Sequence, residues 1–443
     1  MNYKVGLVSL GCEKNRVDAE IMLSKLKDAG YTLVSEIENC DIAIINTCGF
    51  IEASKKESID EIFNLIRLKQ SNKIKAIIVT GCLSERYKQE IRKEIPEIDA
   101  VVGIGSNKDI VSIVKNVTDG KNIDKFGEKN DMPLSGNRVR TTPNHYAYLK
   151  IADGCDNCCT YCAIPLIRGH FRSRTMEDIL SEANQLANEG VKELLVIAQD
   201  TTRYGEDLYG KLMLPELLKQ LCKIDKIEWI RILYCYPDRI TDELIDVIAS
   251  EEKILNYIDL PLQHCNEKIL KAMNRTGNKE SLTGLLSKIR SKIPDVILRT
   301  TFIVGFPGET DDEFNELCEF SKEISFDRMG CFCYSPEEGT RAADFENQID
   351  EDTKRHRQQI IMDEQMSIME QKSKQMVGKK IKVLVEGYYD KANCYFGRSY
   401  ADSPDVDGKV YFEVDNENIP QPGDFIEVLI DDCIECDLIG DMI

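Results

Sequence analysis

The sequence has none of the features that mark a membrane or secreted protein. Its longest unbroken apolar run is five residues, 194–198, whereas a membrane-spanning helix needs roughly 18. The first residues, 1–5, lead directly into a strand-like pattern and do not resemble a secretory signal peptide. We therefore expect a soluble, cytoplasmic protein with no membrane partner.

Common nucleotide-binding and zinc-binding signatures are also missing. The chain has neither a GxxxxGK[ST] loop nor a GxGxxG motif after a strand, which argues against the usual phosphate-binding and dinucleotide-binding sites. It has four histidines, of which His264 alone follows an expected barrel strand, and there a structural role is expected. Cys433 and Cys436 form a single CxxC pair without a second one, so a zinc site is not expected there.

An excess of positive charge is missing as well. The chain carries 57 Lys and Arg against 77 Asp and Glu, a net charge of −20. Such a chain repels phosphate backbones, so direct nucleic-acid binding is not expected and a basic protein partner suits it better.

Cysteine, in contrast, is abundant, with 17 residues. A small secreted domain would use them as disulfides, but this chain is long and lacks an export signal. In a reducing compartment such thiols act as metal ligands or as small buried residues.

The length of 443 residues suggests roughly three domains, and the sequence pattern divides the chain accordingly. Residues 1–118 alternate apolar runs with amphipathic stretches, which predicts a doubly wound α/β domain. The runs are 5–9, 42–46 and 76–80, and the amphipathic stretches include 17–29 and 54–68. The polar stretch 119–144 is expected to be a linker.

Residues 141–372 continue the alternation through six strand–helix units, which predicts a partial (β/α)6 TIM-like barrel. Its strands are expected at 146–151, 193–199, 229–235, 257–262, 297–304 and 328–334, and a long charged helix at about 350–376. Residues 375–443 alternate as strands between Gly, Pro and Asp, which predicts a small antiparallel β-barrel.

One set of cysteines forms a CxxxCxxC loop directly after the first barrel strand. Cys155, Cys159 and Cys162 can direct three thiolates at one centre, an arrangement that holds a four-iron cluster and leaves one iron open. Cys158 permits an alternative, because two CxxC pairs could form a four-sulfur zinc site. Zinc ribbons separate their pairs by a longer loop, so the cluster is the favoured interpretation.

A second set is spread over the first domain. Cys12, Cys48 and Cys82 each close one expected parallel strand. Loops at the carboxyl ends of neighbouring strands converge in a doubly wound sheet, so these thiols are expected to make a second three-thiolate site. The alternative is three small residues buried beside glycine turns.

Motifs along the whole chain resemble those of the methylthiotransferase family, in its RimO-type branch. The matching segments are Ser9-Leu10-Gly11-Cys12-Glu13-Lys14-Asn15, Asn46-Thr47-Cys48-Gly49, Thr80-Gly81-Cys82, residues 153–165 with Arg168-Gly169, Leu260-Pro261-Leu262-Gln263-His264, Gly305-Phe306-Pro307-Gly308-Glu309 and Tyr334-Ser335-Pro336-Glu337. Gly397-Arg398-Ser399-Tyr400 and Pro404-Asp405-Val406-Asp407-Gly408 are similar to the family's C-terminal TRAM domain.

The resemblance implies a radical S-adenosylmethionine (SAM) enzyme that adds a methylthio group to the β-carbon of an aspartate in small-subunit ribosomal protein twelve. It also implies two 4Fe-4S clusters, S-adenosylmethionine and an electron donor. By carry-over, Cys155, Cys159 and Cys162 hold the radical cluster, and Cys12, Cys48 and Cys82 hold the auxiliary cluster. The family motif leaves Cys158 unassigned, so it is expected not to be a ligand.

Further contacts to S-adenosylmethionine are expected at the barrel strand ends. Gln199 and Asp200 follow the second strand, where this superfamily contacts the methionine amino group, although the sequence departs from the commoner Gly-Gly-Glu pattern. Ile303 and Gly305 on the fifth strand, and Tyr161 before the last loop cysteine, are expected at the adenine. Ordinary barrel packing is the alternative for each of them.

Two other functions compete with this one. The sister tRNA methylthiotransferases also resemble the chain, but the expected C-terminal barrel carries a net charge of −9 and should repel tRNA. Acids such as Asp405 and Asp407 are expected to attract the basic ribosomal protein instead. An iron–sulfur electron carrier would leave the six-unit barrel and the open iron unexplained.

Overall fold

The computed structural model describes residues 3–414 and 418–443, which divide into two compact units. The first unit contains residues 1–141, 152–174 and 335–343, and the second contains 142–151, 175–334 and 344–443. The cysteine loop after the first barrel strand therefore belongs to the same unit as the N-terminal segment. No helix within residues 3–414 and 418–443 combines the length and the apolar character that a bilayer crossing requires.

The first unit is built on a six-stranded parallel sheet with the order β2-β1-β3-β4-β5-β6. Its central strands are fully buried apolar runs, as expected for a parallel sheet with both faces covered. The strands are β1 (Lys4–Ser9), β2 (Thr32–Val34), β3 (Ile42–Thr47), β4 (Ala76–Gly81), β5 (Ala100–Val102) and β6 (Ile123–Lys125).

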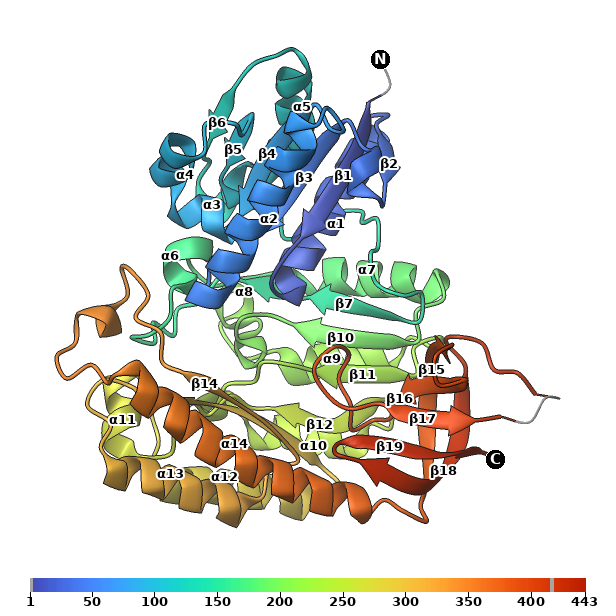
Figure 1. Ribbon diagram of the computed structural model, residues 1–443. Coiled ribbons are helices and arrows are strands. Elements are labelled where there is room, and N and C mark those ends of the chain that lie inside the picture. Colours follow the sequence, from blue (N-terminus) through green and yellow to red (C-terminus); the bar gives the residue numbers. More distant parts are fainter. Residues whose placement is uncertain (1–2, 415–417) are drawn as a thin grey trace. The chain divides into compact units, whose positions relative to one another are not determined.

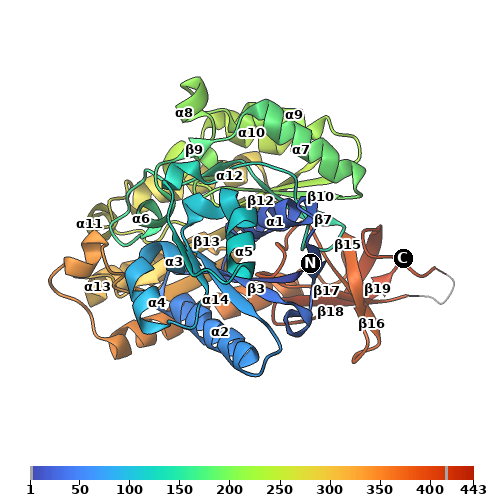
Figure 2. The ribbon, with the colours of Figure 1, turned by 90° about the horizontal axis from the view of Figure 1, so that it is seen from above.

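Helices cover both faces of this sheet, which confirms the doubly wound α/β prediction. Helices α1 and α5 lie on one face of the sheet and α2 and α4 on the other (Figure 2). Side chains of the first pair belong to one hydrophobic core and those of the second pair to another. The helices are α1 (Glu13–Asp28), α2 (Glu52–Gln70), α3 (Cys82–Arg86), α4 (Lys88–Glu94) and α5 (Ile110–Thr118). The later segment of this unit contributes β8 (Ala152–Asp153), α6 (Ile164–Arg168) and β9 (Arg172–Ser173).

The expected linker at 119–144 is not wholly a linker. Residues Ile123–Lys125 form β6, which pairs in parallel with β5 and extends the sheet. The prediction missed β2, β5 and β6 because each has three residues, too few to produce a recognisable apolar run.

The second unit contains a six-stranded parallel sheet in the order β14-β13-β12-β11-β10-β7, as predicted for a partial barrel (Figure 1). The strands are β7 (Tyr146–Lys150), β10 (Glu193–Ile197), β11 (Trp229–Ile232), β12 (Ile254–Asp259), β13 (Ile297–Val304) and β14 (Arg328–Cys333). The helices are α7 (Met176–Asn188), α8 (Glu206–Tyr209), α9 (Leu214–Cys222), α10 (Asp242–Ser250), α11 (Glu267–Ala272), α12 (Lys279–Lys292), α13 (Asp311–Ile324) and α14 (Glu351–Lys374).

The chain ends in a closed five-stranded barrel with the order β15-β16-β17-β19-β18. Its pairs are antiparallel except that β17 and β19 run parallel, a detail that the alternating pattern did not predict. The strands are β15 (Lys380–Tyr389), β16 (Cys394–Arg398), β17 (Val410–Glu413), β18 (Phe425–Ile434) and β19 (Asp437–Met442).

Buried charges join this barrel to the first residues of the parallel strands. Glu193, the first residue of β10, accepts hydrogen bonds from Arg231 Nε at 2.8 Å and from Arg398 Nη2 at 2.6 Å. Arg398 also donates through Nε to Glu386 at 2.7 Å. The C-terminal barrel is therefore attached at the amino ends of the parallel strands. Active sites of (β/α) barrels lie at the opposite edge, at the carboxyl ends of the strands.

The structure corrects the expectation for Asp407. Its side chain is 3% exposed, and its carboxylate accepts hydrogen bonds from the Tyr257 hydroxyl at 2.7 Å and from the Ser403 backbone at 2.9 Å. Asp407 cannot attract a partner from solvent because it already joins the barrel to β12. Asp405, two residues earlier, is exposed.

Candidate functional site

The strand-end cysteines, Cys12, Cys48 and Cys82, follow three neighbouring strands of the first sheet. Cys12 precedes α1, Cys48 comes directly after β3, and Cys82 begins α3 directly after β4. The sheet order reverses between β1 and β3, which makes the carboxyl ends of these strands the crevice where α/β sheets bind ligands.

Glycines allow the three loops to approach one another closely. A Cβ added at Gly11 would lie 2.8 Å from Cys48 Sγ, and one at Gly81 would lie 2.4 Å from the Thr47 carbonyl oxygen. Both glycines also have positive φ, +86° and +100°, which other residues rarely adopt. The loops that carry the strand-end cysteines are therefore packed against each other.

Two of these thiols, Cys48 and Cys82, are buried, whereas Cys12 is exposed. Burial raises the pKa of Cys82 to about 12 and also raises the pKa of Cys48, and the charge of Cys12 contributes to both shifts. Such thiols ionise readily only beside strong positive charge, which bound iron supplies. Within residues 3–414 and 418–443, no three His, Cys, Asp or Glu side chains gather as ligands of a single ion would. A four-iron cluster is wider, because each thiolate binds a different iron.

The cysteine loop, residues 153–162, lies between β8 and α6. The carboxylate of Asp153 accepts a hydrogen bond from the Gly154 backbone at 2.8 Å and is ion-paired with Arg168 at the end of α6. The Cys155 backbone N–H donates to the Gly169 carbonyl at 3.2 Å. Both ends of the loop are therefore held together at its base. Cys158 has a φ of +49° and is exposed.

The two sets of cysteines come from distant segments but belong to one unit. Cys82 packs in one buried cluster with Ala163 and Ile167, and Ala163 is the residue after Cys162. Arg168 Nη2 donates to Asn15 Oδ1 at 2.8 Å and to Asp18 Oδ2 at 2.9 Å. Asn15 and Arg168 lie within the motifs that resemble the family, but no role was predicted for them or for Asp18. The position of Arg168 six residues after Cys162 was the available signal.

A further segment of this unit, residues 335–343, contacts both sets of cysteine-bearing loops. Glu337 pairs with Arg86 of α3, whose Nη1 also donates to the Gly49 carbonyl beside Cys48 at 2.7 Å. The Ala342 backbone N–H donates to the Thr160 carbonyl within the cysteine loop at 2.9 Å. No role was predicted for Glu337 either, because nothing in its local sequence indicates its partners.

The expected S-adenosylmethionine contacts lie partly in the second unit. Gln199 and Asp200 follow β10, at the carboxyl edge of the parallel sheet. The buried Asp200 carboxylate accepts hydrogen bonds from Thr202 Oγ1 at 2.6 Å and from Arg239 Nη1 at 3.1 Å. Asp200 thus orders the loop after β10, and its role toward the methionine group stays a prediction.

The remaining expected contacts are Tyr161, Ile303 and Gly305. Tyr161 is half-buried in the cysteine loop of the first unit, and Ile303 lies on β13 opposite Phe332 of β14 in the second. Gly305 has a φ of +70°, and a Cβ there would lie 2.3 Å from Cγ of Lys354 on α14. Glycine at this position is thus required by helix packing, whatever else it contacts.

The structural role expected for His264 stays a prediction. The ring is fully buried, and its Nδ1 accepts a hydrogen bond from the Asn266 backbone at 2.9 Å. Burial lowers the pKa of His264 to about 3, so the ring is neutral near pH 7. The contact of 3.9 Å between its Nε2 and Glu309 is therefore not an ion pair at that pH.

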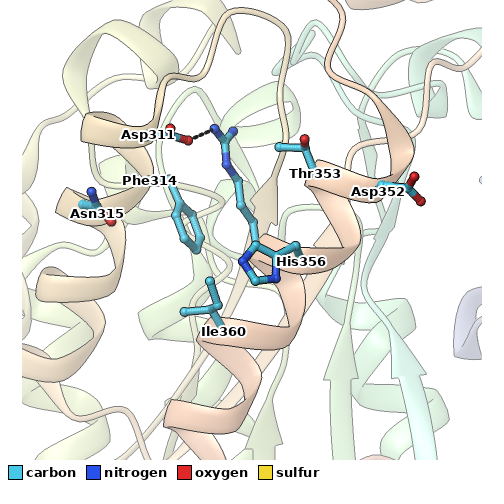
Figure 3. Close-up of a pocket in the computed structure, with 8 residues that line it drawn as sticks. Asp311, Phe314, Asn315, Asp352, Thr353, His356 and Ile360 are labelled. Atoms are coloured by element: carbon cyan, nitrogen blue, oxygen red, sulfur yellow. Dashed lines mark hydrogen bonds and ion pairs between the residues drawn. The ribbon is translucent and has the colours of Figure 1, made fainter.

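A surface pocket of about 630 Å³ lies elsewhere, between the first turns of α13 and α14 (Figure 3). Phe314 and Ile360 form its apolar wall, and Arg357 donates to Asp311 across it at 2.7 Å. None of the expected ligand or cofactor residues lines this pocket.

Three segments of the chain match known protein families. Residues 4–103 match a family described as Uncharacterized protein family UPF0004, residues 149–321 match the Radical SAM superfamily, and residues 377–443 match the TRAM domain. Membership of the radical SAM superfamily implies a 4Fe-4S cluster and S-adenosylmethionine.

A solved structure shares the fold at low identity. The radical S-adenosylmethionine methyltransferase TsrM from Kitasatospora setae superposes with a TM-score of 0.56 at 12% identity. The match covers 74% of this chain and 73% of that one.

Two relatives are similar over their full length. The ribosomal protein uS12 methylthiotransferase RimO of Thermoanaerobacter sp. (strain X514) is 50% identical over 438 residues, which cover 99% of each chain. The protein of the same name from Clostridioides difficile (strain 630) is 49% identical over 445 residues, again 99% of each chain. The methylthiotransferase resemblance found in the motifs therefore extends over the whole sequence, and the chain belongs to the RimO family of ribosomal protein uS12 methylthiotransferases.

Proposed function

We propose that this protein adds a methylthio group to the β-carbon of an aspartate in ribosomal protein uS12. The observation that carries the proposal is the union of two cysteine sets in one compact unit, within a chain that matches uS12 methylthiotransferases over its full length. A single cluster would suffice to generate a radical. A reaction that also inserts sulfur needs a second site, and the strand-end cysteines offer one.

In this proposal Cys155, Cys159 and Cys162 hold the radical cluster, and Cys12, Cys48 and Cys82 hold an auxiliary cluster. When bound, the clusters and S-adenosylmethionine supply radical chemistry that an unactivated C–H bond requires, together with the sulfur and the methyl group. An electron donor is needed as an external partner. Cys158 is not a ligand in this assignment.

The chain's own residues hold the reacting groups in place. Asp153 and Arg168 close the base of the cysteine loop, so the three loop thiols are presented together. In the proposal Gln199 and Asp200 orient the methionine end of S-adenosylmethionine, and Tyr161, Ile303 and Gly305 contact its adenine. The ion pair of Asp200 with Arg239 supports this role, because it fixes the loop on which both polar residues lie.

The charge of the chain favours a basic protein substrate. The C-terminal segment 377–443 carries 6 Lys and Arg against 15 Asp and Glu, a net charge of −9. Such a surface attracts a basic ribosomal protein and repels tRNA, the substrate of the alternative function. A ribosomal substrate also agrees with the cytoplasmic location expected from the sequence.

The deciding experiment is mass spectrometry of uS12 isolated from cells that co-express the protein. The proposal expects an added methylthio mass on one aspartate, and no added mass when the co-expressed protein carries Cys159→Ala. An unmodified uS12 together with methylthiolated tRNA would favour the alternative. If the protein formed no deoxyadenosine from S-adenosylmethionine and reductant, an electron carrier would be favoured instead.

The boundaries 1–118, 141–372 and 375–443 remain our proposal for the three domains.

A further inference from the structure

Arg168 is a buried cation between two carboxylates from distant parts of the chain. Its side chain is 1% exposed, while those of Asp18 and Asp153 are 5% and 0% exposed. Arg168 Nη1 donates to both carboxylate oxygens of Asp153, at 3.1 and 2.8 Å. Nη2 donates to Asp18 Oδ2 at 2.9 Å. Because Asp153 precedes the loop cysteines and Asp18 follows Cys12, the guanidinium joins the segments that carry both sets.

The same guanidinium nitrogen reaches one of the strand-end cysteines, Cys82. Arg168 Nη2 lies 4.0 Å from Cys82 Sγ and 2.8 Å from Asn15 Oδ1, and that amide oxygen is 3.6 Å from the same sulfur. The Asn15 amide nitrogen donates to the carbonyl groups of Leu10 and Thr47, each at 3.0 Å. Asn15 therefore contacts the chain two residues before Cys12 and directly before Cys48, and Arg168 contacts Cys82 itself.

At 4.0 Å from Cys82 Sγ, the positive charge of Arg168 acts strongly on a group bound to that sulfur. The guanidinium is permanently protonated, and a buried site screens it far less than water would. Reduction of a cluster adds negative charge, which a nearby cation favours and a nearby carboxylate opposes. Reduction potentials of iron–sulfur clusters depend on such charges and on hydrogen bonds to their sulfurs.

We propose that Arg168 is a positioning residue for the auxiliary site. It ties the cysteine loop to the strand-end cysteines and, together with Asp18, sets the charge that a cluster held by Cys12, Cys48 and Cys82 experiences. This inference rests on the proposed function, because that proposal assigns the auxiliary cluster to these three residues.

The test uses the full-length protein with Cys155, Cys159 and Cys162 replaced by Ala, so that the strand-end cysteines hold any remaining cluster. Iron and sulfide content and the midpoint potential from an EPR-monitored redox titration are measured after anaerobic reconstitution. In this parent, Arg168→Met is expected to shift the potential downward, because a cation is lost. Asp18→Asn is expected to shift it upward, because an anion is lost.

Arg67→Met is the matched control, because it removes the same charge. Arg67 is exposed in the last turn of α2, so its replacement should leave the potential unchanged. Opposite shifts for Arg168→Met and Asp18→Asn would separate an electrostatic role from a merely structural one, which would move neither potential or both in the same direction.

Unchanged potentials, or shifts of the same sign, at full iron content would overturn the inference. If Arg168→Met does not fold, the Asp18→Asn variant alone tests the inference, which requires its cluster potential to rise. Failure of the parent itself to bind iron would instead contradict the auxiliary site in the proposed function.

Discussion

Glu337 accepts a hydrogen bond from Arg86 across 251 positions of sequence, with 2.9 Å between Oε2 and Nη1. The two side chains are 3% and 5% exposed. Lys55 of α2 pairs with the same carboxylate oxygen at 3.2 Å. One buried carboxylate thus connects segment 335–343 to the helices that follow Cys48 and Cys82.

Replacement of Glu337 by Gln should destabilise the first unit markedly. Breaking a buried ion pair from one side typically costs about 3–5 kcal/mol, because the partner cations remain buried without compensation. Glu52→Gln is the matched control, since Glu52 also pairs with Lys55 but its side chain is 78% exposed. Its loss should cost less than about 1 kcal/mol. The Tm of each variant is measured by thermal unfolding monitored with circular dichroism. Equal decreases in Tm for the two variants would contradict the difference between the buried Glu337 and the exposed Glu52.

The two cysteine sets should differ in iron content and in chemistry. Anaerobic reconstitution is expected to yield about eight irons per chain from two four-iron clusters, and about four in Cys12→Ala. Cys12→Ala should still cleave S-adenosylmethionine to deoxyadenosine but should not transfer sulfur, whereas Cys159→Ala should form no deoxyadenosine. Cys433→Ala, in the C-terminal barrel, is the control and should match the unmodified protein. Methylthiolation of uS12 by Cys12→Ala would show that the second site is wrongly assigned.

Acid should weaken the attachment of the C-terminal barrel through Glu386. Burial raises the pKa of Glu386, but hydrogen bonds and charge from His145 and Arg398 outweigh it and lower the pKa to about 2. A lowered carboxyl pKa contributes stability that is present above the unfolded pKa of about 4.3 and is lost as the pH falls toward 2. The contribution at pH 7 is about 3 kcal/mol.

Urea unfolding at pH 7 and pH 3 measures this contribution. Glu386→Gln should be less stable than the unmodified protein at pH 7, and the difference should narrow at pH 3. Glu413→Gln, at an exposed position of the same barrel, should show neither effect. A difference for Glu386→Gln that stays constant with pH would rule out the ionised carboxylate as its source.

Exposed acids of the C-terminal barrel should capture the basic substrate. Asp405, Asp431 and Asp432 are exposed, so their combined replacement by Asn should weaken binding of uS12 several-fold at low salt. The difference should shrink at high salt, because ions screen exposed charges. Asp407→Asn should act differently and reduce stability, since that carboxylate is buried against Tyr257. Affinity that does not change with salt, measured by surface plasmon resonance, would exclude electrostatic docking.

Much of the fold followed from local pattern. The strand at Ile297–Val304 begins and ends where periodicity predicted it, because it is long and is followed by a glycine. The three-residue strands β2, β5 and β6 were missed, because pairing with a neighbour rather than their own composition makes them strands.

Part of the candidate site could likewise be predicted from the sequence, and part could not. The cysteines were identified because a thiol beside a glycine at a strand end is visible in the sequence, and the topology of parallel sheets brings such ends together. The partner of a buried charge is not visible in this way. Asp407 was expected to face solvent, yet it lies against Tyr257 and β12.

By itself, the sequence determined the order of the three folds, the positions of the thiols and the family, since these depend on residue type, spacing and local periodicity. The tertiary structure alone decided that Arg168 meets Asp18, 150 residues away, and that Glu337 meets Arg86. Packing selects these pairs, because a charge removed from water must find whichever opposite charge the fold brings beside it.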